Sequence, residues 1–211
     1  MNDQPLRADD AVIIFADLQE GIINVGLTAD QSRLRVCVAA LADIATICSI
    51  PVAISCVPTT SGTVAPPLAE IAQRFPAALA HVRTTPNPLD DGALRATLEK
   101  SGRKVLIIAG VVTEVAVALA AFAAHRLGYA VTIAVDACSG LDARSESAAF
   151  TRMSALGITL SSVPTIVAEL AQDFSSERGR AAMRALQSMI APHAHTHAEH
   201  DYDRAARDEP D

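Results

Sequence analysis

The fold is decided by residues 104–128, KVLIIAGVVTEVAVALAAFAAHRLG, because the spacing of the apolar residues changes halfway along them. Residues 105–111 form a continuous apolar run, which is typical of a strand buried on both faces. From Glu114 onward, Ala, Leu and Phe recur at helical spacing. A strand therefore passes directly into a helix at residues 110–113. In a parallel sheet this junction lies at the carboxyl end of a strand, where open α/β folds bind their ligands.

Strand-like and helix-like segments alternate along the rest of the chain. This alternation predicts an α/β protein, a three-layer α/β/α sandwich built on a six-stranded parallel sheet with right-handed crossovers. One domain is expected over residues 1–191, followed by a polar tail over residues 192–211. The other predicted strands span residues 11–17, 52–57, 79–82, 131–136 and 158–163, and the other helices begin near residues 30, 68, 90 or 91, 146, 165 and 177.

Composition narrows the class of partner. Half of the residues are apolar and 19% are charged, yet no apolar run reaches the roughly 18 residues that span a bilayer. A net charge of -7 argues against a nucleic acid or an anionic membrane as partner, since either needs a basic surface. The first residues do not resemble a signal peptide. We therefore expect a cytoplasmic protein that acts on a small molecule.

Two residue types that often carry chemistry have simpler interpretations here. The four cysteines lie inside apolar segments without a CxxC pair, which favours reduced thiols in the core. The tail could chelate a metal, but it has no fixed scaffold of its own, and a polar tail is the simpler interpretation. It holds His193, His195, His197 and His200.

Three positions are expected to face one crevice. Asp17 ends the first strand, Arg83 follows the third, and residues 113–116 follow the fourth. If the strand order is 3-2-1-4-5-6, the order reverses between the first and fourth strands and the three positions converge. A buried Asp beside an Arg, under a helix amino terminus, suits acid–base chemistry on a polarised carbonyl. Taken singly, the Asp is equally typical of a cap and the Arg of a salt bridge.

Several motifs in order resemble a known family. The runs FADLQEG at residues 15–21, NPLD at 87–90, LIIAGVVTEVAVA at 106–118 and GYAVTIAVDACSG at 128–140 are similar to the isochorismatase-like cysteine hydrolase superfamily. They are most similar to its YcaC-like branch, whose members are taken to be amidohydrolases. The resemblance covers roughly residues 8–175. It implies the sheet order 3-2-1-4-5-6, hydrolysis of a small amide, no cofactor, and a homo-oligomer that is a tetramer or an octamer.

The resemblance also assigns roles to individual positions. Asp17 corresponds to the general base, Arg83 to the basic residue, and position 116 to the cysteine nucleophile of the family's GVxTxxC turn. The backbone N–H groups of Val112 and Ala116 correspond to the oxyanion hole. A thiol in the first turn of a helix ionises readily because it lies at the positive end of the helix dipole. The family often carries a cis peptide in this turn, expected here at Val111–Val112.

Three further residues are candidate substrate contacts. Gln19 is expected either to orient Asp17 or to begin the next loop. Asn87 matches an asparagine near the pocket of the YcaC-like branch, although a loop Asn is usually a turn former. Glu114 has the ordinary role of an acidic residue at a helix start, with direct chemistry as the alternative. Residues 58–67, PTTSGTVAPP, have no counterpart of the Asp and His cluster that binds metal in related nicotinamidases, so no catalytic metal is expected.

Position 116 departs from the family pattern because it is alanine. Three hypotheses follow. The natural protein has a cysteine there and the alanine was introduced, to trap a substrate or silence the enzyme. Alternatively, the alanine is natural and Asp17 protonates a vinyl ether, as in true isochorismatases, although these usually carry Lys where Arg83 stands and a guanidinium donates protons poorly. In the third hypothesis the protein is a non-catalytic member with a binding or scaffold role.

Overall fold

The computed structural model describes residues 5–24 and 27–190, so the predicted tail over residues 192–211 and its four histidines lie outside the described residues. Within these ranges, no helix is both long and apolar enough to cross a membrane. The elements are β1 (Ala11–Ala16), α1 (Gln31–Ile47), β2 (Val52–Cys56), α2 (Ala69–Ala72), β3 (Ala80–Val82), η1 (Pro88–Asp90), α3 (Gly92–Ser101), β4 (Val105–Val111), η2 (Thr113–Val117), α4 (Ala118–Arg126), β5 (Ala130–Ser139), α5 (Ala143–Ala155), β6 (Thr159–Ser161) and α6 (Val163–Ala171), followed by a helix over residues 177–190.

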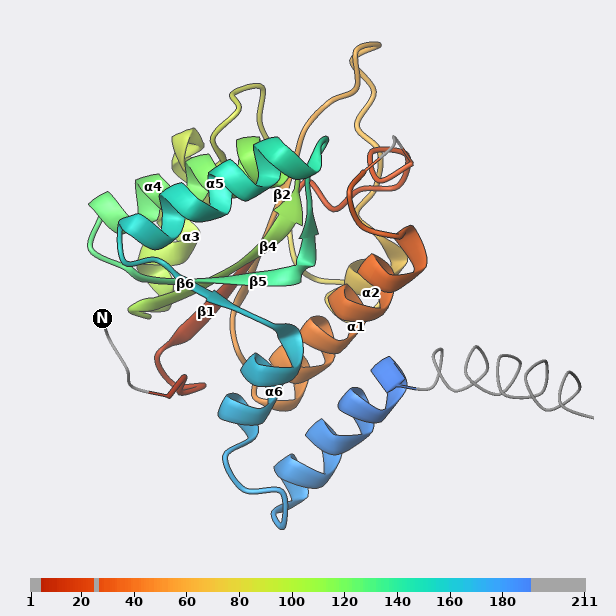
Figure 1. Ribbon diagram of the computed structural model, residues 1–211, viewed down its shortest axis with the longest axis vertical. Helices are drawn as coiled ribbons and strands as arrows, with labels where there is room; N and C mark the ends of the chain where they lie inside the picture. Colours follow the sequence, from red (N-terminus) through yellow and green to blue (C-terminus); the bar gives the residue numbers. More distant parts are fainter. Residues whose placement is uncertain (1–4, 25–26, 191–211) are drawn as a thin grey trace, which may run out of the picture.

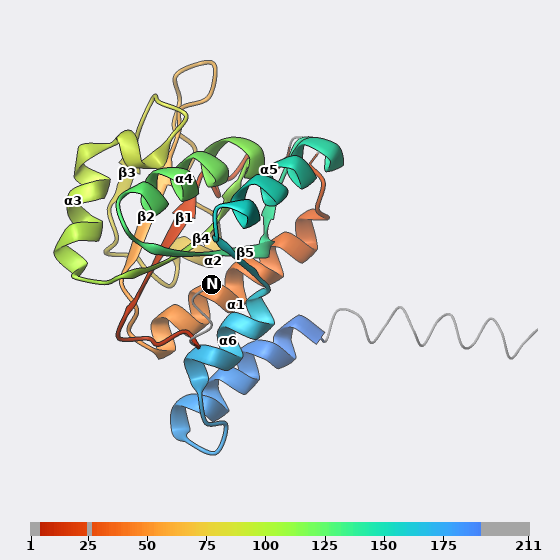
Figure 2. The ribbon, with the colours of Figure 1, turned by 60° about the vertical axis from the view of Figure 1, so that its left-hand side comes forward.

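The six strands form one parallel sheet in the order β3-β2-β1-β4-β5-β6, which confirms the predicted fold class and strand order (Figure 1). The central strand β1 is buried along its whole length, as its continuous apolar run predicts. Helices α3, α4 and α5 cover one face of the sheet. Helices α1, α2 and α6 cover the other, so the molecule has three layers, and the helix over residues 177–190 packs on the outer side of α1 and α6 (Figure 2).

Helix boundaries follow the capping residues. The Asp30 carboxylate accepts a hydrogen bond from the Arg33 N–H at 2.9 Å and begins α1 as predicted. Of the two aspartates considered for the start of α3, Asp91 is the cap, and its carboxylate accepts from the Leu94 N–H at 2.7 Å. Helix α3 ends at Gly102, whose φ of 67° is the left-handed conformation that glycine adopts most readily.

Several elements differ from the prediction. Helix α5 begins at Ala143 rather than near residue 146, α6 begins at Val163 rather than near residue 165, and β6 spans only Thr159–Ser161. Strand β5 continues to Ser139 rather than ending at Asp136. The Asp136 carboxylate accepts from the Val163 N–H at 2.7 Å, in the first turn of α6, whose N-cap is Ser162. The residues after β4 do not enter an α-helix directly, because η2 is a π-helical turn that precedes α4. Such single turns inside helices frequently occur at functional sites.

A close approach between β1 and β4 fixes the junction that carries the candidate site. Gly110 pairs with Ala16 in the β1–β4 register. A Cβ at residue 110 would lie 2.8 Å from the Ala16 Cβ and would collide with the Ala16 carbonyl oxygen. Only glycine fits here without a backbone shift. Asp17 and the turn that begins at Thr113 therefore follow two strands that are closely paired at their carboxyl ends.

Candidate active site

Asp17 and Arg83 form a buried ion pair at the carboxyl edge of the sheet. The Arg83 Nη2 donates to the Asp17 Oδ2 at 2.8 Å, and both residues are at most 5% exposed. The same nitrogen donates to the Pro86 carbonyl oxygen at 3.3 Å. Asp17 lies after β1 and Arg83 after β3, so the pair spans the end of β2. The structure thus brings together two of the residues predicted from the sequence.

The backbone holds Asp17 in an unusual conformation. Its φ of 56° falls in the left-handed region, which is uncommon for residues other than glycine and is often found at functional sites. The Asp17 N–H donates to the Ser55 carbonyl oxygen at 2.9 Å, and the Asp17 carbonyl oxygen accepts from the Gln19 N–H at 2.9 Å. These bonds end β1 at Ala16 and turn the Asp17 side chain toward Arg83.

The ion pair leaves polar atoms without partners. Within the described residues, no hydrogen bond is made by Asp17 Oδ1, Arg83 Nε or Arg83 Nη1, although all three atoms are buried. A buried polar group without a partner costs free energy, so such groups are rare unless a ligand or water completes them. The ion pair therefore retains one acceptor oxygen and two donor nitrogens for further hydrogen bonds.

Burial also changes the acidity of Asp17. Removal from water raises its pKa from 3.8 to about 6, against the opposing attraction and hydrogen bond of Arg83. A carboxyl group with such a pKa exchanges protons near neutral pH. This pKa is compatible with the general-base role expected of Asp17.

The turn after β4 places residue 116 beside this edge of the sheet. Ala116 is buried in the same core as Ala16, the residue before Asp17. The peptide bond between Val111 and Val112 is cis, as expected for the turn. The Val112 carbonyl oxygen accepts from the Val115 N–H at 3.0 Å and from the Val117 N–H at 3.4 Å, which closes the turn.

Glu114 does not cap its own helix. Its Oε1 instead accepts hydrogen bonds from the Leu141 N–H at 3.0 Å and from the Ser145 hydroxyl at 2.7 Å. The neighbouring Thr113 hydroxyl donates to the Glu146 Oε1 at 2.7 Å. These bonds join the turn that carries residue 116 to the start of α5, a role that no local sequence pattern indicates.

The two other candidate contacts also bond to backbone. The Gln19 amide donates to the carbonyl oxygens of Val57 at 3.1 Å and Ala65 at 2.8 Å and accepts from the Val57 N–H at 2.8 Å. The Gln19 side chain therefore holds the loop over residues 57–67 in place, and its hydrogen bonds are made to this loop rather than to the Asp17 carboxylate. Asn87 accepts from the Leu89 N–H at 3.0 Å and so caps η1, the ordinary role of a loop asparagine.

Sequence reasoning missed one buried polar residue at this edge. Ser55 is fully buried near the end of β2, and its hydroxyl oxygen has no hydrogen-bond partner among residues 5–24 and 27–190. Its position in the apolar run VAISC was the available signal, because a hydroxyl in a buried strand requires a partner.

The four cysteines lie in the core, as predicted, and burial makes their thiols weak acids. Burial raises the pKa of Cys56 to about 11 and that of Cys138 to about 12, and it also raises the pKa values of Cys37 and Cys48. A protonated, shielded thiol is a poor nucleophile. These residues therefore do not substitute for a nucleophile at position 116.

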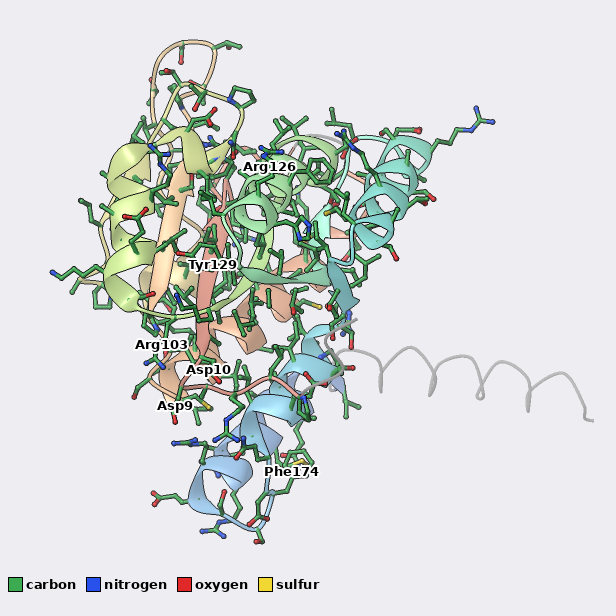
Figure 3. The ribbon with its side chains drawn as sticks, turned by 90° about the vertical axis from the view of Figure 1, so that its left-hand side faces the viewer. Asp9, Asp10, Arg103, Arg126, Tyr129 and Phe174 are labelled. Atoms are coloured by element: carbon green, nitrogen blue, oxygen red, sulfur yellow. The ribbon has the colours of Figure 1, made fainter. Side chains whose placement is uncertain are left out.

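Elsewhere the described chain has open cavities but no cluster of possible metal ligands. In residues 5–24 and 27–190, no group of three or more His, Cys, Asp or Glu side chains could hold a metal ion. Open cavities of about 260 and 790 Å³ lie at the amino-terminal edge of the sheet, opposite the ion pair. They are lined by residues that include Lys104 and Tyr129, and Figure 3 shows Tyr129, Arg103 and Asp10 on this side.

Comparisons with known proteins agree with this arrangement. The chain is 29% identical over 176 residues to the probable hydrolase YcaC of Escherichia coli (strain K12), covering 82% of this chain and 83% of the relative. The crystal structure of the E. coli YcaC gene product, described as an octameric hydrolase of unknown specificity, superposes with a TM-score of 0.85 at 26% identity, covering 96% of this chain and 98% of that one. YcaC from Pseudomonas aeruginosa, with hexane-2,5-diol and covalent acrylamide, gives a TM-score of 0.85 at 27% identity over 95% and 99% of the two chains.

A family model also covers most of the chain. Residues 11–165 match the isochorismatase domain, a span that begins with β1 and ends within α6. It therefore contains Asp17, Arg83 and the turn that carries Ala116. On this match and the shared fold, the chain belongs to the isochorismatase family of hydrolases.

Proposed function

We propose that this site is built for hydrolysis of a small amide by covalent catalysis and that Ala116 stands at the nucleophile position. The observation that carries the proposal is the buried Asp17–Arg83 ion pair, which has three polar atoms without partners and follows strands whose carboxyl ends lie at the same edge of the sheet as the turn after β4. The covalent acrylamide on the P. aeruginosa relative supports the presence of a nucleophile in that protein, because acrylamide reacts with nucleophiles at its C=C bond.

With a cysteine at position 116, the reaction would proceed in two steps. Asp17 takes the thiol proton, and the thiolate attacks the amide carbonyl carbon. The backbone N–H groups of Val112 and residue 116 stabilise the negative oxygen. The C–N bond breaks, the amine leaves with the proton held by Asp17, and a thioester remains. Water, deprotonated by Asp17, then releases the acid and restores the thiol.

Arg83 supports this chemistry without touching the nucleophile. Its Nη2 holds the Asp17 Oδ2, which leaves Oδ1 free to accept the proton. Its remaining N–H groups can bind an acceptor on the substrate. Gln19, Asn87 and Glu114 act in this proposal by fixing the surrounding loops and the turn.

Ala116 has no group for covalent attack, so the chain as it stands would bind an amide without cleaving it by this route. We propose that the natural nucleophile is a cysteine. The test is Ala116→Cys, assayed for ammonia or amine release from a panel of small amides. Turnover that is lost again in Ala116→Cys/Asp17→Asn supports the proposal. If the panel gives neither turnover nor an acyl-enzyme, a binding or scaffold role takes its place.

The pKa of Asp17 favours one alternative function. Because burial raises this pKa to about 6, part of the population carries a proton at neutral pH. The acid could protonate the C=C bond of a vinyl ether, after which water adds to the resulting oxocarbenium ion and the hemiketal releases an alcohol and a carbonyl compound. This route needs no nucleophile at position 116. Cleavage of a vinyl ether by the Ala116 chain, abolished by Asp17→Asn, would select it over amide hydrolysis.

We also propose that the chain forms a homo-oligomer, as the octameric E. coli relative does. Large apolar side chains are exposed on neighbouring elements, namely Leu127 at 54%, Leu156 at 45% and Leu160 at 37%. Leu160 lies on β6, the edge strand of the sheet, where a second subunit could cover it. Light scattering on the purified chain should give a tetramer or an octamer, and a monomer would contradict this proposal.

A further inference from the structure

Ser55 is a buried hydroxyl that the proposed reaction does not use. Its side chain is fully shielded, and its Oγ is without a hydrogen-bond partner in the described part of the chain. The residue is structurally tied to the site, because its carbonyl oxygen accepts the Asp17 N–H at 2.9 Å. An orphaned hydroxyl next to an incompletely bonded ion pair points to a missing polar partner.

The strand register shows which face Ser55 occupies. Ser55 pairs with His81 of β3, and the His81 Nε2 lies 3.3 Å from the Thr97 Oγ1 of α3. His81 therefore faces the α3 side of the sheet. Arg83 lies two residues after His81, and Ala53 lies two residues before Ser55. Ala53 packs in the core under α3 and α4, on the same side of the sheet as His81. Strand alternation thus places Ser55 and Arg83 on the same face.

The neighbours of Ser55 at this level are small. Ser55 pairs with Ala16, and Ala16 pairs with Gly110, so three neighbouring strands carry a serine, an alanine and a glycine side by side. Ala116 packs into the same core from the turn after β4. The neighbouring strands β1 and β4 therefore place no bulky side chain beside Ser55 at this level.

The atoms without hydrogen-bond partners determine which chemical groups a ligand would need in order to bond to all of them. Arg83 Nε and Nη1 require an acceptor, Asp17 Oδ1 requires a donor when ionised, and the Ser55 hydroxyl can serve either way. A carboxylate would repel an ionised Asp17, and an ammonium group would repel Arg83. A primary carboxamide carries a carbonyl acceptor and an N–H donor on one neutral group, and so it matches the whole set.

We propose that Ser55 is a ligand contact whose hydroxyl bonds to the carboxamide of a small substrate bound between Asp17 and Arg83. This inference rests on the proposed function, because it places the amide in that same site. It adds a specificity-determining residue: Ser55, together with Arg83, selects a carbonyl oxygen, while Asp17 selects the N–H group.

The test compares the unaltered Ala116 chain with Ser55→Ala, using propionamide as the probe and propionate as its charged control. Binding is followed by NMR chemical-shift titration of the full chain at pH 7.5. We expect propionamide to bind better than propionate and Ser55→Ala to weaken propionamide binding about 5-fold, the effect of one neutral hydrogen bond. Equal propionamide affinity of the two chains, or no propionamide binding by the unaltered chain, overturns the inference.

A stability control separates ligand binding from a structural role. Ser139 is also fully buried, but its hydroxyl oxygen accepts from the Ala29 N–H at 2.9 Å. Ser139→Ala should therefore lower the melting temperature, whereas Ser55→Ala breaks no hydrogen bond within the described residues and should leave it unchanged or raised. A comparable drop for Ser55→Ala would show a structural role and contradict the inference.

The outcomes for the reaction and for Ser55 are separable. If Ala116→Cys hydrolyses amides while Ser55→Ala binds propionamide as well as the unaltered chain does, amide hydrolysis stands and the Ser55 contact is overturned. If Ala116→Cys shows no turnover while Ser55→Ala still weakens propionamide binding, the Ser55 contact stands in a site that binds amides without cleaving them.

Discussion

The Asp17 carboxylate and the Arg83 guanidinium meet at 2.8 Å although they follow strands that are not adjacent in the sheet. The Arg83 side chain crosses the end of β2 to reach Asp17, and both groups are buried. Each partner therefore depends on the other for its charge to be tolerated away from water. This dependence leads to the first two predictions.

The first prediction concerns the pKa of Asp17 itself. A ¹³C NMR titration of the side-chain carboxyl should give a value of about 6. Arg83→Met should raise the pKa further, because burial remains while the attraction and the hydrogen bond of the guanidinium are lost. A value near 3.8 in the unaltered protein would show that water reaches the carboxylate and would remove the basis for its acid–base role.

The same shift makes stability depend on pH. Because the folded-state pKa of Asp17 lies above the unfolded value, the folded state binds the proton more tightly. The free energy of unfolding is therefore highest below about pH 4. It falls as the pH rises through the folded-state pKa of about 6, with a total loss of about 3 kcal/mol, and is constant at higher pH. Urea unfolding at successive pH values should show this loss, and Asp17→Asn should lack it.

Gly110→Ala should be among the most damaging single changes. The added Cβ would collide with the backbone of Ala16, so β1 and β4 would have to separate, at a cost of about 2–4 kcal/mol. Gly92→Ala is the matched control, since nothing lies within 4 Å of a Cβ there and alanine favours the helix. Chemical unfolding of both variants measures the difference, and equal stabilities would contradict the close β1–β4 approach.

Glu114→Ala should loosen the turn that carries residue 116. It removes the acceptor of the Leu141 N–H and the Ser145 hydroxyl, with an expected loss of about 1–3 kcal/mol. Hydrogen exchange at the Leu141 amide should become faster. Ser145→Ala removes only one of the two bonds and should have a smaller effect on both readouts. Unchanged exchange in Glu114→Ala would mean that another contact holds this amide.

Gln19→Leu should release the loop over residues 57–67. The amide makes three hydrogen bonds to its backbone from a fully buried position, and leucine would leave those groups unpaired. We expect a loss of about 2–4 kcal/mol and faster proteolysis within the loop. Unaltered proteolysis would contradict the fastening role and would reopen a direct role for Gln19 in the site.

Much of the fold could be predicted from the sequence, because the local patterns of apolar and capping residues indicate the same elements that the tertiary structure contains. The apolar run over residues 105–111 became β4, and Asp30 caps α1 as its position indicated. The site residues Asp17 and Arg83 were predicted from their places after strands, and the parallel sheet brings such places to one edge.

What the sequence could not show depends on contacts between distant segments. Asp136 was expected to end a strand, but its carboxylate bonds to Val163, 27 residues away. Glu114 lies in the first turn of its helix, as expected, but its carboxylate accepts from the Leu141 N–H and the Ser145 hydroxyl rather than capping that helix. Ser55 carries no motif, and its significance appears only once Asp17 and Arg83 are placed beside the end of its strand.

The central claim is that residue 116 is a nucleophile position served by Asp17. The most direct test is the intact mass of Ala116→Cys after brief mixing with a reactive small amide and acid quenching. We predict an added acyl group on Ala116→Cys, greatly diminished in Ala116→Cys/Asp17→Asn, and no addition to the Ala116 chain, whose four cysteines are buried. An unmodified Ala116→Cys, or equal labelling of the Ala116 chain, would contradict the claim.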